Sequence, residues 1–189
     1  MIRTMRDVLV LTRTDFERLP DEGRWEVVEG RAILVPPPEI EHQEICDRLN
    51  RLLFTRLQAI SGAFVVSALS VFIPRTPKSY GEIQSRVPDV IVSRREPQRY
   101  FEAGQPPELV IEVLSTPRGN VERSEKIDDY ARAGISEYWI VDPFKRAVEV
   151  YRMNDRGEYA PPDIVSEGQL TPRAFPSAEI DIESIWTKK

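Results

Sequence analysis

The sequence predicts a mixed α/β fold of the α+β kind, with a central sheet, two main helices and flanking hairpins. Three observations predict it. Residues 107–142 read as strand, turn, helix and strand, residues 39–60 have the apolar spacing of a long helix, and short paired strands are expected on both sides. The 189 residues are enough for a proper core, and we predict a single domain over residues 1–189 with its core at about residues 24–152.

The composition is typical of a globular protein, with 41% hydrophobic and 30% charged residues. The net charge of −5 argues mildly against a nucleic-acid partner, although a local basic groove is compatible with an acidic total. The single cysteine, Cys46, excludes an intramolecular disulfide and a zinc site built from cysteines, and it fits a reducing compartment. The single histidine, His42, excludes a multi-histidine metal site. No apolar stretch reaches the ~20 residues of a membrane span, so we expect a cytoplasmic protein without membrane contact.

The N-terminal part is expected to form a short helix and then a hairpin. Residues 14–17 have the spacing of a capping box, and Pro20 ends this helix. Residues 25–29 and 32–35 read as two strands joined at Gly30. Three prolines then separate the hairpin from the long helix predicted over residues 39–60.

The middle of the chain is expected to supply two more strands. They are predicted at residues 64–73 and 87–92, with a polar loop over residues 74–85 between them. A second loop, rich in arginine and proline, is predicted over residues 94–107.

The central unit, residues 107–142, organises the fold. Residues 109–114 form a β-branched run typical of a strand buried on both faces. Turn residues follow at 117–120, then a helix that Gly134 ends as a left-handed cap, and a strand at residues 138–141. A unit of this length favours two parallel strands with a right-handed crossover.

The C-terminal part is expected to be rich in β structure. Residues 146–152 are predicted to pair back as a hairpin strand, and a turn at residues 154–157 leads to a short strand near Tyr159. The tail ends in a small apolar segment at residues 180–186.

Three charged residues of this framework form a candidate catalytic site. Asp89 begins one predicted strand, Glu112 interrupts the neighbouring strand, and Lys126 lies on the helix that follows. Because adjacent strands are about 5 Å apart, the two carboxylates are placed to share one cation. Hard divalent ions such as Mg²⁺ prefer such oxygen ligands, and a lysine nearby would stabilise charge developing on a phosphate. This pattern indicates phosphodiester hydrolysis.

Each residue alone also has a purely structural interpretation. Asp89 follows a proline and would simply end a turn, Glu112 would form a salt bridge, and Lys126 would pair with Glu122 along the helix. Taken singly, these interpretations are favoured. The combination of two acids on strands and a lysine on the next helix favours a functional site.

The joint pattern resembles the Uma-two family, a group of bacterial proteins described as restriction-endonuclease-like. The segments that carry the resemblance are RVPDV at 86–90, ELVIEVLS at 108–115, Lys126 with Tyr130, AGISEYWIVD at 133–142, and upstream WEVVEG at 25–30 with His42. The resemblance covers nearly the whole chain, roughly residues 10–186.

The resemblance implies a fold and an activity. That family belongs to the PD-(D/E)XK nuclease superfamily, which implies a core of helix, three strands, helix and strand, and hydrolysis of DNA that depends on Mg²⁺ or Mn²⁺. Asp89 and Glu112 match the two metal-binding acids, and the backbone carbonyl of Val113 would be a third ligand. The usual superfamily lysine lies two residues after the glutamate, where this chain has Leu114, and Lys126 takes its place on the helix.

Glu26 and His42 are two further candidates that the resemblance points to. Members of the superfamily often bring an extra acid from this region, so either side chain would contact the metal-bound water. For His42 the alternative is a histidine at a helix start that bonds a local carbonyl, and this alternative is slightly favoured.

We therefore expect a Mg²⁺-dependent endonuclease, a hydrolase that cleaves DNA. One rival is a catalytically inactive member of the same fold that binds DNA or protein. A second rival is another enzyme with paired carboxylates, such as a glycosidase, which the lysine beside the acids disfavours. A homodimer is the default expectation for a symmetric duplex substrate.

Overall fold

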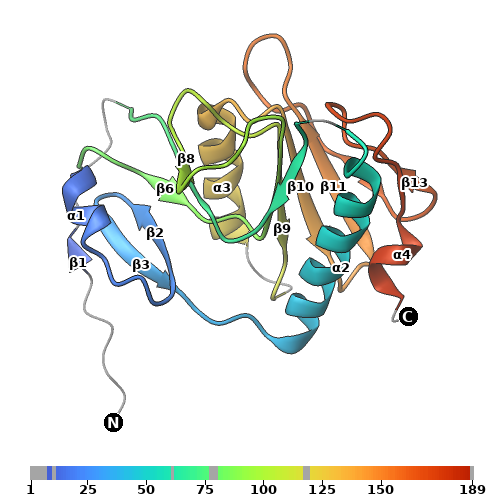
Figure 1. The fold of residues 1–189 in the computed structure, drawn as a ribbon, viewed down its shortest axis with the longest axis horizontal. Coiled ribbons are helices and arrows are strands. Elements are labelled where there is room, and N and C mark those ends of the chain that lie inside the picture. The colour runs from blue at the N-terminus through green and yellow to red at the C-terminus, as the bar shows by residue number, and fades with distance from the viewer. Residues whose placement is uncertain (1–7, 10–11, 61, 77–80, 117–119, 188–189) are drawn as a thin grey trace.

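The structure confirms the mixed α/β class (Figure 1). It is a computed structural model that describes residues 8–9, 12–60, 62–76, 81–116 and 120–187. Within these residues, two six-stranded sheets and one two-stranded sheet combine with helices α1 to α4. None of the described helices is long and apolar enough to cross a membrane.

One six-stranded sheet, called here the central sheet, has the strand order β12-β11-β10-β9-β7-β4. Its strands are β4 (Phe64–Val66), β7 (Val90–Ser93), β9 (Leu109–Val113), β10 (Glu137–Asp142), β11 (Ala147–Arg152) and β12 (Asp163–Val165). β9 and β10 are parallel, as the central unit predicts, and the other neighbours are antiparallel.

Helices α2 (Ile40–Leu57) and α3 (Asn120–Ala133) cover opposite faces of this sheet (Figure 1). Ile111 and Val113 pack with the leucines of α2, whereas Val110 packs with residues of α3. Since side chains alternate along a strand, Glu112 shares the α3 face with Val110. This alternation places the carboxylate where a side chain of α3 can reach it.

The second six-stranded sheet, the N-terminal sheet, has the order β1-β3-β2-β6-β5-β8. Its strands are β1 (Val8–Leu9), β2 (Arg24–Val28), β3 (Arg31–Val35), β5 (Ser70–Phe72), β6 (Ser85–Arg86) and β8 (Tyr100–Phe101). The predicted hairpin is β2–β3, and its two turn residues, Glu29 and Gly30, have φ values of 49° and 74°. Both are left-handed, as a tight hairpin turn requires.

The prediction of a single strand over residues 64–73 is wrong. This segment forms two strands, β4 and β5, which belong to different sheets. Ala68, with φ of 58°, turns the chain between them. The strand predicted over residues 87–92 also starts late, at Val90, because Pro88 lacks the N–H of a ladder residue. Asp89 therefore lies where the chain passes from β6 in the N-terminal sheet to β7 in the central sheet.

Two smaller predictions need correction. The loop predicted over residues 94–107 contains β8, which pairs in parallel with β5. The first helix, α1 (Arg13–Glu17), is capped by Thr12 with Asp15 rather than from residue 14. The predicted turn at Pro117 and Gly119 lies outside the described residues, as do residues 77–80 of the polar loop.

The end of α3 and the C-terminal tail follow the predictions. Gly134 has φ of 80°, and the N–H groups of Gly134 and Ile135 donate to the carbonyls of Ala131 and Tyr130. This is the Schellman arrangement, which satisfies the last carbonyls of the helix. The tail forms β13 (Gln169–Leu170), β14 (Ile180–Asp181) and the short helix α4 (Glu183–Trp186), and its apolar side chains pack against α2.

Candidate active site

One cavity of about 390 Å³ brings together all five predicted site residues. Its walls come from β2, the segment that follows β3, the start of α2, the end of β9 and α3. The lining includes Glu26, His42, Asp89, Glu112 and Lys126, together with the Val113 backbone position. Residues far apart in the sequence thus converge on one cleft, called here the acidic cleft.

Glu112 is held by two side chains of α3. The Tyr130 hydroxyl donates a hydrogen bond of 2.5 Å to Glu112 Oε1, and Lys126 Nζ lies 3.1 Å from the same oxygen. Lys126 and Tyr130 are four residues apart, so they share one face of the helix. The lysine on the helix therefore reaches the glutamate on the strand, as the resemblance requires.

The electrostatics of Glu112 fit a bound cation. Burial raises the pKa of this carboxyl to about 7; Lys126 lowers it, while Asp89 and Glu26 raise it further. Lys126 thus does not offset the burial of Glu112 and the repulsion from Asp89 and Glu26. A divalent ion beside Glu112 would favour its ionised form, and carboxylate oxygens are the donors that Mg²⁺ prefers.

Asp89 contacts residues of β9, β2 and the long helix α2 at this cleft. Its Oδ2 accepts the Val113 N–H at 2.9 Å and lies 3.2 Å from His42 Nε2, and its Oδ1 lies 3.3 Å from Arg24. Burial alone would raise the pKa of Asp89, but His42, the Val113 N–H and the charge of Lys126 together hold the pKa below its usual value. Asp89 is accordingly a carboxylate, hydrogen-bonded to the residue that follows Glu112.

His42 contacts a carboxylate rather than only a local carbonyl. It lies in the first turn of α2 and is buried. Burial would lower its pKa, but Asp89 and the Val113 backbone raise it above the ordinary histidine value. The other ring nitrogen, Nδ1, lies 3.5 Å from Cys46 Sγ. The structural alternative considered for His42 therefore misses its principal partner, which is Asp89.

Glu26 is buried on β2 and lies beside the candidate lysine. Its Oε1 is 3.7 Å from Lys126 Nζ and accepts the Val87 N–H at 3.2 Å. Its Oε2 is 3.0 Å from Arg86 Nη1. Glu26 thus links the N-terminal sheet to the helix that carries Lys126.

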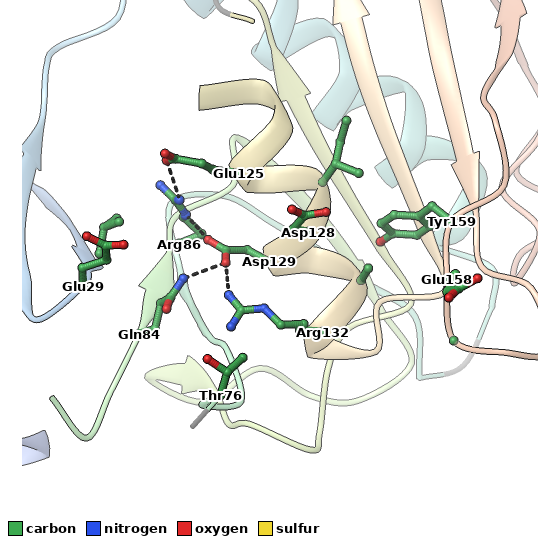
Figure 2. A pocket seen from close by; sticks show the side chains of 14 residues that line it. Glu29, Thr76, Gln84, Arg86, Glu125, Asp128, Asp129, Arg132, Glu158 and Tyr159 are labelled. Atoms are coloured by element: carbon green, nitrogen blue, oxygen red, sulfur yellow. Dashed lines mark hydrogen bonds and ion pairs between the residues drawn. The ribbon is translucent and has the colours of Figure 1, made fainter. Parts of the chain in front are cut away.

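Arg86 and Asp129 are partners that sequence reasoning did not identify. Arg86 Nε donates to Asp129 Oδ2 at 2.6 Å, and both side chains are buried. Figure 2 shows that Asp129 also accepts a hydrogen bond from Gln84 and forms an ion pair with Arg132. Arg86 forms a further ion pair with Glu125. Arg86 precedes an apolar strand and Asp129 lies on a helix rich in charged residues, and neither position reveals the pair.

The larger cavity in Figure 2 is not the predicted site. It has a volume of about 670 Å³ and is lined by α3, by Arg86 and by residues near Tyr159. None of the five predicted residues lines it. We assign the candidate chemistry to the smaller acidic cleft, because the paired acids and the lysine converge there.

Comparison with solved structures defines the class of protein. The fold matches the crystal structure of "a putative nuclease belonging to DUF820" from Anabaena variabilis, with a TM-score of 0.72 and 20% identity. The match covers 92% of this chain and 96% of that chain. The fold is therefore nuclease-like.

The family follows from the sequence itself. The sequence model of the Uma2 family, described as "putative restriction endonuclease", matches residues 13–183. The chain belongs to this family, which is the Uma-two family of the predicted resemblance. Among curated proteins, no match to the chain was found.

Proposed function

We propose that the chain is an endonuclease that hydrolyses DNA phosphodiester bonds in the acidic cleft with the help of Mg²⁺ or Mn²⁺. The observation that carries this proposal is the convergence of Asp89, Glu112 and Lys126 in one cavity of a nuclease-like fold. Membership of the family supports the same reaction class.

Asp89, Glu112 and the Val113 carbonyl are the residues that would hold the ion. Both acids are buried, and Asp89 raises the pKa of Glu112, as expected of two carboxylates that need a shared cation. When bound, the divalent ion would act as a Lewis acid toward the scissile phosphate.

We assign positioning and electrostatic roles to Lys126, Glu26 and His42. Lys126 would stabilise negative charge that develops on the phosphate, since its ammonium already lies beside Glu112. Glu26 would hold Lys126 in place or contact the attacking water. His42 would keep the Asp89 carboxylate oriented through its 3.2 Å contact.

DNA as substrate, a homodimeric assembly and a cytoplasmic location complete the proposal. Duplex DNA has two-fold symmetry, which a dimer would match. Because the chain carries a net charge of −5, phosphate contacts must come from local basic groups such as Arg24, Arg123 and Lys126 at the cleft. An inactive DNA-binding or protein-binding module is the alternative.

Cleavage of single-stranded and double-stranded DNA with millimolar Mg²⁺ or Mn²⁺ tests the proposal. We expect cleavage by the wild type, none in the presence of chelator, and a loss of at least about 100-fold in Glu112→Gln. Glu158→Gln, which changes an exposed acid outside the cleft, is the matched control and should cleave normally. Equal cleavage by Glu112→Gln would show that the acidic cleft is not where DNA is cut. No cleavage by the wild type would leave the inactive module as the better description.

A further inference from the structure

We propose that His42, Cys46 and Asp89 form a second metal site, selective for a thiophilic divalent ion such as Zn²⁺. All three side chains are buried. One ligand atom from each lies within 4.8 Å of the other two. This cluster lies beside the proposed magnesium site and shares Asp89 with it.

The backbone places two of the ligands on one face of a helix. His42 and Cys46 are four residues apart on α2, and Nδ1 and Sγ are 3.5 Å apart. On the other side of the ring, Nε2 is 3.2 Å from Asp89 Oδ2. Bonds of about 2.0–2.3 Å to a tetrahedral ion place its ligand atoms roughly 3.3–3.6 Å apart. The Nε2–Oδ2 separation is close to that range, whereas the sulfur of Cys46 lies beside the other ring nitrogen, Nδ1.

A single ion takes one ring nitrogen. With Nε2 and Asp89 Oδ2 as ligands, the Cys46 sulfur would have to approach the ion, and one ligand atom from each of the three residues lies within 4.8 Å of the other two. Binding replaces the thiol proton of Cys46, which passes to solvent. His42 and Asp89 line the acidic cleft, so the ion and a water as fourth ligand can enter from there.

The donor set decides which ion binds. Thiolate and imidazole favour Zn²⁺ and Co²⁺, whereas Mg²⁺ requires oxygen ligands. Glu112 and Lys126 are not part of this set, because they lie on the α3 face of the sheet. The two sites therefore differ in ion preference while competing for Asp89.

The shared aspartate gives the second site a regulatory effect, and this step rests on the proposed nuclease function. An ion bound to His42, Cys46 and Asp89 withdraws one carboxylate from the magnesium site. Zn²⁺ would then inhibit cleavage even in excess Mg²⁺.

Titration of the full chain with Co²⁺ tests the site without any need for activity. We expect a thiolate-to-cobalt absorption band that saturates at one equivalent in the wild type and survives excess Mg²⁺. Cys46→Ser should abolish the band, and His42→Ala and Asp89→Asn should each weaken Co²⁺ binding at least about tenfold. Glu112→Gln, which removes only the magnesium site, should keep the band, and circular dichroism checks that each variant is folded.

The outcomes separate this inference from the proposed function. No thiolate band in the wild type, or a band unaffected by both His42→Ala and Asp89→Asn, overturns the second site. If the band behaves as expected but no DNA is cleaved, the second site stands and the nuclease proposal fails. In an active protein, Cys46→Ser should raise the Zn²⁺ concentration needed for inhibition at least about tenfold, and unchanged inhibition contradicts the competition.

Discussion

At the scale of single residues, the position of the lysine is the feature that sets this cleft apart. Leu114, directly after β9, occupies the position where the superfamily pattern has its lysine, and it is partly buried among the residues that pack with α3. Lys126 reaches Glu112 from the helix instead, with its ammonium 3.1 Å from the carboxylate. A strand-borne lysine is thus not needed to bring a cation to this acid.

The role of Lys126 gives a direct prediction. Lys126→Gln should lower the single-turnover rate of DNA cleavage by roughly 10²–10³-fold, because it removes charge stabilisation at the phosphate. Binding of the metal ion should persist, since both acids remain. The matched control is Lys145→Gln, which removes an exposed lysine paired with Asp142 and should cleave at the wild-type rate. A rate for Lys126→Gln equal to that of the control would remove Lys126 from the chemistry.

At the scale of elements, the position of α3 on the sheet decides where Lys126 points. Asp129 lies about one turn after Lys126, and its pairing with Arg86 ties α3 to β6 of the N-terminal sheet. Arg86 also contacts Glu26, which itself lies beside Lys126. The ion pair therefore holds the helix and the lysine relative to the N-terminal sheet.

Removing one partner of this pair should be costly. Asp129→Asn should lower the free energy of unfolding by about 3 kcal/mol, because Arg86 is left buried with weaker compensation. The neighbouring Asp128→Asn changes an exposed acid and should stay within about 0.5 kcal/mol of the wild type. Urea unfolding measures both. Similar values for the two variants would show that the pair does not anchor α3.

The sequence predicted the elements that local chemistry encodes. The hairpin at Gly30, the parallel pair around Glu112 and the glycine cap at Gly134 all have turn residues or apolar runs of the right period. The break at Ala68 was not predictable in this way, because alanine carries no preference for the left-handed backbone that divides β4 from β5.

The candidate site was predictable only in part, for a similar reason. Asp89 and Glu112 stand out as charges beside or within apolar segments, whereas Lys126 lies on a helix rich in charged residues. Arg86 and Asp129 are 43 residues apart in the sequence, and their contact arises from packing of a helix on two sheets. A single sequence does not encode such long-range pairing in any local pattern.

At the scale of the whole molecule, the cleft forms where the chain passes from the N-terminal sheet to the central sheet. The N-terminal sheet supplies Glu26, the central sheet supplies Glu112, and Asp89 lies in the crossing between them. The acidic cleft therefore depends on both sheets.

Glu137, which begins β10 and does not line the acidic cleft, gives a pH dependence of stability. It is 1% exposed, and burial raises its pKa, although Trp139 Nε1 and the Arg173 N–H donate to it at 2.9 and 2.6 Å. Between about pH 4.5 and the raised pKa, the carboxyl of Glu137 keeps a proton in the folded protein that it has lost in the unfolded chain. The wild type should therefore lose stability relative to Glu137→Gln as pH rises above about 4.5, by at most about 1.4 kcal/mol per pH unit. Urea unfolding over a pH series measures this difference. A difference independent of pH would contradict it.

The central claim is that Asp89 and Glu112 form one magnesium site, and Mg²⁺ binding measured by calorimetry tests it most directly. The titration is made at pH 8, where a carboxyl with a pKa of about 7 is ionised. We predict one bound ion for the wild type and for Cys46→Ser, and none for Asp89→Asn combined with Glu112→Gln. Undiminished binding by the double variant, or no binding by the wild type even with DNA present, would contradict the account.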